Sequence, residues 1–245
     1  MFLQQLINGL TLGSVYALIA LGYTMVYGIL ELINFAHGEI YMLGAYLGII
    51  FLGFFTVIGL TYYSLSLALL LTFLLSIIFC SSYGFTVEKI AYKPLRNAPR
   101  LSPLISAIGV SIFLQNYVML TQGATDKVFP PLFAGSAIEF LSVRMTYLQL
   151  FIIFASGILM LGLRFFVRKT KMGKAMQAVA QDRIMASLVG INIDTVISST
   201  FIIGSGLAAV AGVMVAMYYG LVNYSIGYIA GIKAFTAAVL GGIGS

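Results

Sequence analysis

The long apolar runs of this sequence constrain its fold more than any other feature. Several exceed 18 residues, and the chain as a whole is 61% hydrophobic and only 8% charged. A soluble domain of this length carries about 25% charged residues, whereas about 20 apolar residues are enough to cross a bilayer as a helix. The sequence therefore predicts a polytopic helical membrane protein.

The positions of the runs predict an all-α transmembrane bundle with about six full spans and a partial C-terminal one. The full spans are expected at about residues 3–30, 40–59, 65–85, 104–120, 147–167 and 195–219. The last run, 230–245, is too short for a full crossing and has no polar cap. We therefore treat 1–245 as a single transmembrane domain and expect the protein to continue beyond it.

The basic residues predict how these spans are oriented. Ten of the thirteen lie in two loops between apolar spans, and none precedes Lys89. Basic loops face the cytoplasm, so three spans before the first loop place the N-terminus outside. Two further spans separate the two basic loops, which agrees in parity. Membrane topology accounts for the net charge of +6 better than nucleic-acid binding does, and the missing basic segment excludes a cleavable signal peptide.

The longest polar passage, residues 164–192, combines a basic start with an alanine-rich second half. Good helix propensity predicts one or two short helices outside the bilayer, with Gly190 ending the last of them. A loop that only fixes topology explains the basic start. It does not explain the small residues beyond, which we expect to leave a slim surface for a partner: Ala178, Ala180, Ala186 and Gly190.

A second polar passage, ELINFAHGE at residues 31–39, allows two interpretations. It is either a tight interfacial turn with solvated charges, or a helix break that faces a central pathway or locks one helix to another. The candidate residues are Asn34, His37 and Glu39. A metal site lacks further ligands nearby, and a catalytic acid–base pair lacks a nucleophile motif.

One face of the fourth span carries mostly polar and small residues, together with Phe113. They follow a 4-3-4-3 spacing that places them on one side of a helix: Ser102, Ser106, Gly109, Phe113 and Asn116. Interhelical hydrogen bonding by serine and asparagine explains this pattern. The alternative is a polar lining for a translocation path, in which the candidates are Ser106 and Asn116.

Two features belong to the outer side of this predicted topology. The loop at 121–146 contains Pro130 and Pro131 but no strong periodicity, and a short surface helix is possible there. Aromatic residues that fit an interfacial belt cluster after the sixth span: Tyr218, Tyr219, Tyr224 and Tyr228.

The sixth span carries the clearest packing signal of the chain. Small residues recur every four positions: Gly204, Ala208, Gly212, Ala216 and Gly220. Each step permits close approach of another helix backbone. The pattern predicts tight helix packing rather than contact with a substrate.

Three stretches resemble one known family. They are GLTLGSVYALIALGYTMVYGILELINFAHGEIYMLGAY (9–46), RLSPLISAIGVSIFLQNYV (100–118) and KAFTAAVLGGIGS (233–245). They are similar to LivH-type permeases, the H subunits of ABC importers for branched-chain amino acids. Within them, INFAHGE is specific for permeases of branched-chain amino acids and of related amides or urea.

The resemblance implies a heteromeric importer in the bacterial inner membrane. Its partners would be a second related permease, two cytoplasmic ATPases and a periplasmic binding protein. The chain would form one permease domain, with a cytoplasmic coupling loop at 168–194. The segment 178–192 resembles a diverged EAA motif, whose first position is Gln177. The coupling residues that this implies are Ala178, Asp182, Arg183, Ala186 and Gly190.

The chain itself carries no sign of catalysis or of nucleotide binding. It has no GxxxxGK[ST] pattern, so ATP is expected on partner subunits and no cofactor on this chain. It also lacks a Ser/His or paired-Asp arrangement, so we do not expect an enzyme. The alternatives are a self-sufficient secondary transporter or channel, for which only one candidate helix break is evident, and a family permease for urea or short amides.

Overall fold

Helices dominate the structure, a computed structural model that describes residues 2–242 except 31, 33, 97, 100, 131–136 and 141–142. Six of the described helices are long and apolar enough to cross a membrane, and a seventh apolar helix is shorter. The six are α1 (Phe2–Leu30), α2 (His37–Val57), α4 (Leu65–Val87), α5 (Leu101–Gln122), α6 (Tyr147–Lys169) and α9 (Ile193–Tyr219), and the seventh is α10 (Ile226–Leu240). The predicted all-α bundle with six spans and a partial C-terminal one is confirmed.

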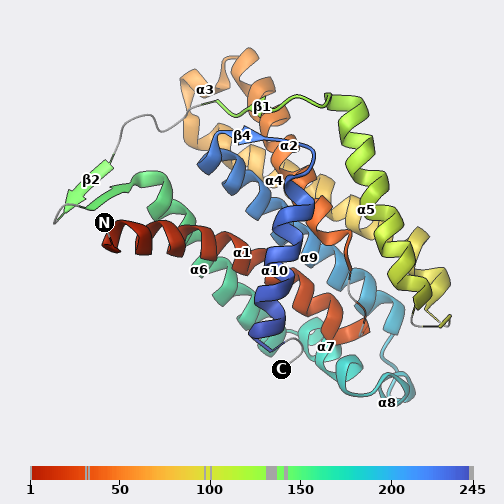
Figure 1. Ribbon diagram of the computed structural model, residues 1–245. Coiled ribbons are helices and arrows are strands. Elements are labelled where there is room, and N and C mark those ends of the chain that lie inside the picture. Colours follow the sequence, from red (N-terminus) through yellow and green to blue (C-terminus); the bar gives the residue numbers. More distant parts are fainter. Residues whose placement is uncertain are drawn as a thin grey trace.

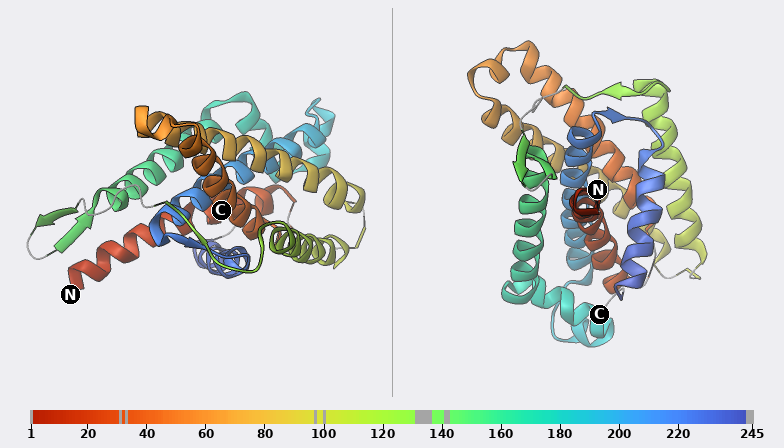
Figure 2. Two further views of the ribbon diagram at one scale, coloured as in Figure 1. Left: turned by 90° about the horizontal axis from the view of Figure 1, so that it is seen from above. Right: turned by 60° about the vertical axis from the view of Figure 1, so that its left-hand side comes forward.

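Helix α9 forms the centre of the bundle. Its most apolar window is 89% buried, whereas that of α6 is 11% buried. It packs against α1, α2 and α4. Figure 1 shows α9 passing through the middle, and the right-hand view of Figure 2 places α5 and α6 on opposite sides of it. The helix with the small-residue ladder is therefore surrounded by the rest of the chain.

Glycines bring the backbones of α2 and α9 into direct contact. A methyl group at Gly44 would lie 2.7 Å from the Ala209 Cα atom, and one at Gly212 would lie 2.8 Å from the Ala45 nitrogen. Real Cβ atoms do not approach other atoms this closely. Larger residues at either position would therefore force these two helices apart.

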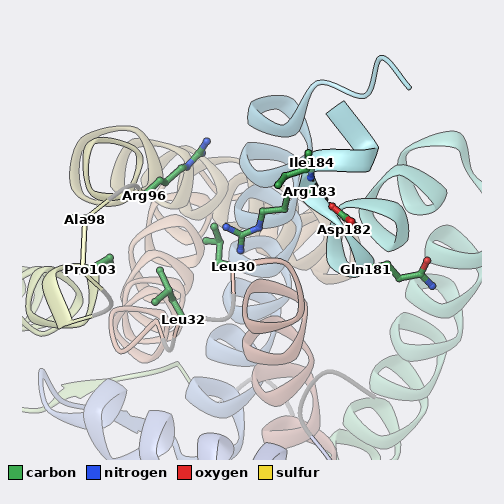
Figure 3. Close-up of a pocket in the computed structure, with 9 residues that line it drawn as sticks. All are labelled: Leu30, Leu32, Arg96, Ala98, Pro103, Gln181, Asp182, Arg183 and Ile184. Atoms are coloured by element: carbon green, nitrogen blue, oxygen red, sulfur yellow. Dashed lines mark hydrogen bonds between the residues drawn. The ribbon is translucent and has the colours of Figure 1, made fainter. Parts of the chain in front are cut away.

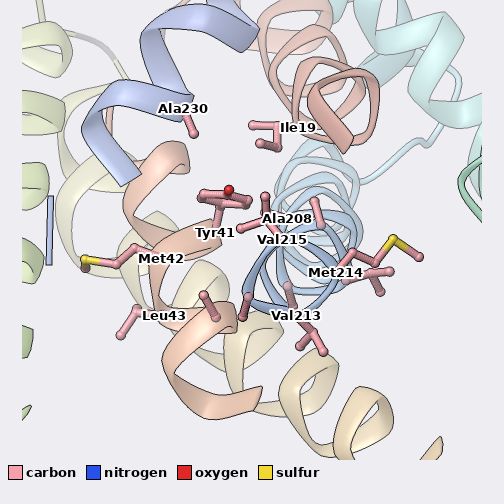
Figure 4. Close-up of a cluster of buried hydrophobic side chains, with 14 of the residues drawn as sticks. Ile19, Tyr41, Met42, Leu43, Ala208, Val213, Met214, Val215 and Ala230 are labelled. Carbon is pink, nitrogen blue, oxygen red and sulfur yellow. The ribbon is translucent and has the colours of Figure 1, made fainter. Parts of the chain in front are cut away.

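Close packing against neighbouring helices also holds for the other residues of the small-residue ladder within α9. Gly204 faces the backbone of Gly22 on α1, and the four residues predicted for helix packing are all buried: Gly204, Ala208, Gly212 and Ala216. Figure 4 shows Ala208 and Val215 of α9 next to Tyr41 of α2, with Ile19 of α1 near by. The fifth ladder residue, Gly220, has a φ of 70° and ends the helix.

The loops after α5 and after α9 contain short strands, and in the first of them a surface helix was possible. Strand β1 (Lys127–Val128) pairs antiparallel with β4 (Leu221–Val222), and β2 (Ala137–Phe140) pairs with β3 (Val143–Thr146). A short helix α3 (Leu60–Tyr63) lies between α2 and α4. The described part of the loop at 121–146 forms strands rather than the short helix that the sequence left possible. The backbone of β1 finds its hydrogen-bond partners almost a hundred residues away.

Helix α4 extends further than the sequence predicted. A π-helical segment η1 (Glu88–Tyr92) and a 3-10 segment η2 (Lys93–Leu95) continue it into the expected loop at 86–103. The buried Glu88 explains the extension, because it forms an ion pair with Arg96 and accepts a hydrogen bond of 2.8 Å from the Ser198 hydroxyl. Tertiary contacts thus stabilise helical turns near Pro94.

Two short helices follow α6, as predicted. They are α7 (Lys171–Gln181) and α8 (Arg183–Leu188). Gly190 has a φ of 85°, and the Ile191 nitrogen donates to the Ala186 carbonyl at 3.0 Å. This geometry closes the end of α8 in the way expected of a glycine in the left-handed region. Figure 1 shows both helices at one end of the bundle, near the C-terminal end of α10.

Replacing Gly212 by leucine is expected to disrupt the bundle. The side chain would collide with the α2 backbone at Tyr41 and Ala45, and overpacking of this kind typically costs about 1–3 kcal/mol. Gly162→Leu on α6 is the matched control, because apart from its chain neighbours and the backbone of α6 itself no atom lies within 4 Å of its Cβ position. Thermal unfolding in detergent measures the effect, and equal stability of the two variants would contradict the packing assignment.

Candidate functional site

The three path candidates of the second polar passage are buried inside the bundle. Asn34 is 2% exposed, and His37 and Glu39 are each 1% exposed. The interpretation as a turn with solvated charges is therefore wrong for these residues, while Glu31 lies outside the described residues. The helical structure is interrupted between α1 and α2. Helix α2 therefore begins inside the protein rather than at its surface.

Hydrogen bonds join this break to neighbouring elements. The Tyr92 hydroxyl of η1 donates to Asn34 Oδ1 at 2.6 Å. The Ser111 hydroxyl of α5 donates to Glu39 Oε1 at 3.0 Å. The His37 ring packs edge-on against Tyr23 of α1, with 4.9 Å between ring centroids. These contacts favour the interpretation that the break locks helices to one another.

The first turn of α10 meets the first turn of α2 at this place. A methyl group at Gly227 would lie 2.5 Å from Glu39 Oε2, and one at Gly231 would lie 3.2 Å from the Gly38 Cα atom. Two helix N-termini, each the positive end of a helix dipole, thus flank one buried carboxylate. The start of α10 at this place was not predicted, although Gly227 and Gly231, spaced four residues apart, could have indicated close helix packing there.

The two candidates on α5 do not join this cluster. The Ser106 hydroxyl donates to the Ala91 carbonyl at 3.0 Å, and Asn116 Nδ2 donates to the Ile112 carbonyl of its own helix at 2.8 Å. Asn116 is exposed. Ser111, which lies outside the predicted 4-3-4-3 pattern, is the α5 residue that reaches Glu39. None of the five path candidates lines the cavities described below.

Beside the last turn of α1, Asp182 and Arg183 hold α8 in place. Asp182 Oδ1 accepts hydrogen bonds from the Ile184 and Met185 nitrogens at 2.8 and 3.0 Å, which caps α8. Arg183 Nη2 donates to the Ile29 carbonyl at 2.5 Å. That carbonyl is in the last turn of α1, where intrahelical donors are missing. The two side chains therefore anchor α8 to the end of α1.

A cavity of about 450 Å³ lies beside this anchor. Figure 3 shows Arg183 reaching toward Leu30, with Arg96 on the opposite wall. Arg96 also forms ion pairs with Glu88 and Asp194, and Lys93 Nζ lies 2.6 Å from Asp194. The cavity thus separates α8 from a charged cluster that ties the end of η2 to the start of α9.

The exposed face of α8 differs from the one expected. Ala186 is only 3% exposed and packs inward, so the prediction that it forms part of a slim outer surface is wrong. Ala178 is half-buried, whereas Gly190 is exposed. The outer face instead consists of large apolar residues that are 62% to 76% exposed: Ile184, Met185, Leu188 and Val189, here called the α8 apolar surface.

This surface had a readable signal in the sequence. Ile184 and Leu188 are four residues apart, as are Met185 and Val189, and this spacing places all four on one side of a helix. Within a polar passage between membrane spans, such a stripe has no bundle interior left to face. Exposed apolar patches of this kind mark interaction sites.

The fold defines a multi-pass helical membrane protein with an anchored helical unit, α7 and α8, at one end. Residues 5–245 match the family model described as the permease component of the branched-chain amino acid transport system, and the chain belongs to this family. It is thus one component of a transport system, which implies partner subunits.

Three relatives show how far the similarity extends. The high-affinity branched-chain amino acid transport system permease protein BraD of Pseudomonas aeruginosa is 51% identical, and LivH of Salmonella typhimurium is 52% identical. Each match covers 100% of this chain and 80% of the relative. A probable LivH of Methanocaldococcus jannaschii is 25% identical over 94% of the chain and 71% of the relative. No solved structure matches.

Removing the Tyr92 hydroxyl is expected to lower the stability of the protein through its effect on the segment between α1 and α2. Tyr92→Phe leaves Asn34 Oδ1 buried without its donor, and an unsatisfied buried acceptor costs about 1–3 kcal/mol. Tyr62→Phe is the control, since Tyr62 is 86% exposed. The melting temperature of each variant in detergent checks this, and an unchanged value for Tyr92→Phe would argue against a locking role.

Proposed function

We propose that this chain is a membrane-spanning permease subunit of an ABC importer that moves branched-chain amino acids into the bacterial cytoplasm. ATP hydrolysis on separate subunits drives the transport. The substrate proposal rests on the relatives, whose names specify branched-chain amino acid transport. These names do not favour urea or short amides, nor a transporter that works alone.

The α8 apolar surface carries the proposal on the structural side. Its four apolar side chains project from α8. The first residue of this helix, Arg183, donates a hydrogen bond to the Ile29 carbonyl at the end of α1. A groove on an ATPase subunit that takes up this surface could move α1 as the nucleotide site closes. In this role Ala178, Ala186 and Gly190 shape the helical unit, and Asp182 caps it.

In the complete importer, we propose four kinds of partner for the chain. It binds a second related permease, two cytoplasmic ATPases, a periplasmic substrate-binding protein and membrane lipid, and it binds no nucleic acid. The chain has no enzymatic activity and no cofactor of its own. The two basic loops and α8 face the cytoplasm, and the N-terminus lies outside.

Co-purification tests the assembly directly. The tagged, full-length protein is extracted from its native membrane, and every partner is identified by mass spectrometry. We expect two ATPases and a second permease. Recovery of the chain alone, still able to move solute in liposomes, would instead identify a self-sufficient transporter.

Placing a charge on the α8 apolar surface should weaken the ATPase contact. Leu188, which is 74% exposed, becomes aspartate, and loss of one interface anchor lowers affinity by about tenfold or more. Lys174→Asp places an aspartate at an exposed position on α7, with an even larger change of net charge, and serves as the control. The ATPase recovered per permease in a pulldown is the readout, and equal recovery from both variants would exclude this docking surface.

A further inference from the structure

One lysine occupies an unusual position on α10. Lys233 is the only charged residue of this apolar helix, and it is exposed. Its Nζ atom lies 5.9 Å from the centre of the Tyr16 ring, and Tyr16 is the midpoint of the membrane-spanning helix α1. The ammonium group therefore lies near the middle of the span, where a charge is expensive unless it is paired or wetted.

The described residues supply Lys233 with no ion pair. The ion pairs found among them join only Glu88, Lys93, Arg96 and Asp194 at the other polar cluster. The Tyr16 ring offers a cation–π contact, which is weaker than a carboxylate partner. Among the described residues, this exposed ammonium near the middle of the span thus has no anionic partner.

A groove next to Lys233 is suited to a small apolar ligand. It has a volume of about 410 Å³, and its walls include Gly13 and Ala17 of α1 and Ala237 of α10. We call it the α1–α10 groove. Binding sites for small molecules fall in this range of volume and combine apolar walls with a few polar groups. Here Lys233 supplies the charged group.

The α1–α10 groove adjoins a second cavity that leads toward the coupling helices. That cavity has a volume of about 780 Å³ and is lined by Gln177 and Gln181 of α7. The two cavities share four lining residues: Leu21, Thr24, Gly241 and Gly242. Together they extend from the middle of α1 to the end of the molecule that carries α7.

We propose that Lys233 binds the carboxylate of the amino acid in transit, within the α1–α10 groove. The aliphatic side chain of the substrate lies against the glycine and alanine walls, and the adjoining cavity continues the path toward α7. This inference rests on the proposed function, because it takes an amino acid as the transported solute. It places the path on the outer face of α1 and α10 rather than at His37 and Glu39.

The first test replaces the ammonium group in the complete importer. Lys233→Met, Lys233→Arg and the wild type are reconstituted in liposomes with their binding protein, and uptake and basal ATP hydrolysis are measured. Lys233→Met should lower uptake by about tenfold or more, since charge-assisted hydrogen bonds are lost, while basal hydrolysis persists. Lys233→Arg should retain most uptake.

Lys89→Met is the matched control for that experiment. Lys89 Nζ also lies over an aromatic ring, 5.3 Å from the centre of Phe85, but it lies outside the groove. Normal uptake by Lys233→Met would overturn the proposal. So would a complex that assembles with arginine but not with methionine, because the charge would then serve a contact between subunits. Absence of uptake by the wild type would instead refute the proposed function.

A second measurement needs no variant. The wild-type importer is treated with a small amine-acylating reagent, at rest and during import, and the modification of Lys233 and Lys89 is compared by mass spectrometry. We expect Lys233 to be modified at rest and protected during import, with Lys89 equally reactive in both states. Equal modification of Lys233 in both states, or none in either, would overturn the proposal, because the amine would be free of substrate or paired with protein.

Discussion

Backbone contact between α9 and its neighbours is the constraint on which the rest of the structure depends. Gly44 approaches Ala209, Gly212 approaches Ala45, and Gly22 approaches Gly204. Within a bilayer the lipid is as apolar as the side chains, so close packing must supply the association that the hydrophobic effect supplies in water. These contacts set the positions of α1 and α2 along α9, and therefore where the chain between them breaks.

The buried polar groups follow from that break. Because α2 begins inside the bundle, its first turn brings His37 and Glu39 out of contact with solvent, and each polar atom there needs a protein partner. Ser111 provides one from α5 and Tyr92 provides another for Asn34. Helix α5 and the segment η1 are thus tied to the centre of the bundle by hydrogen bonds to residues that are buried because α2 begins there.

The sequence predicted what depends on local pattern and missed what depends on distant partners. Apolar runs encode the six spans, and helix propensity encodes the two short helices after α6. A single glycine, Gly190, encodes the end of α8. The pairing of Val128 with Leu221, and the extension of α4 by the ion pair of Glu88 with Arg96, required knowledge of the fold. The inward position of Ala186 was missed for the same reason, since its helical face is decided by the anchor at Arg183.

Helix α1 connects the two regions to which function is assigned here. Its last turn accepts the hydrogen bond from Arg183 of α8, and its middle forms one wall of the α1–α10 groove beside Lys233. The helix is continuous from Phe2 to Leu30, so a shift applied at its end moves the whole wall rather than bending it locally. In the proposed importer, closure of the ATPases against α8 would therefore change the width of the groove directly, without a relay of side chains through the core.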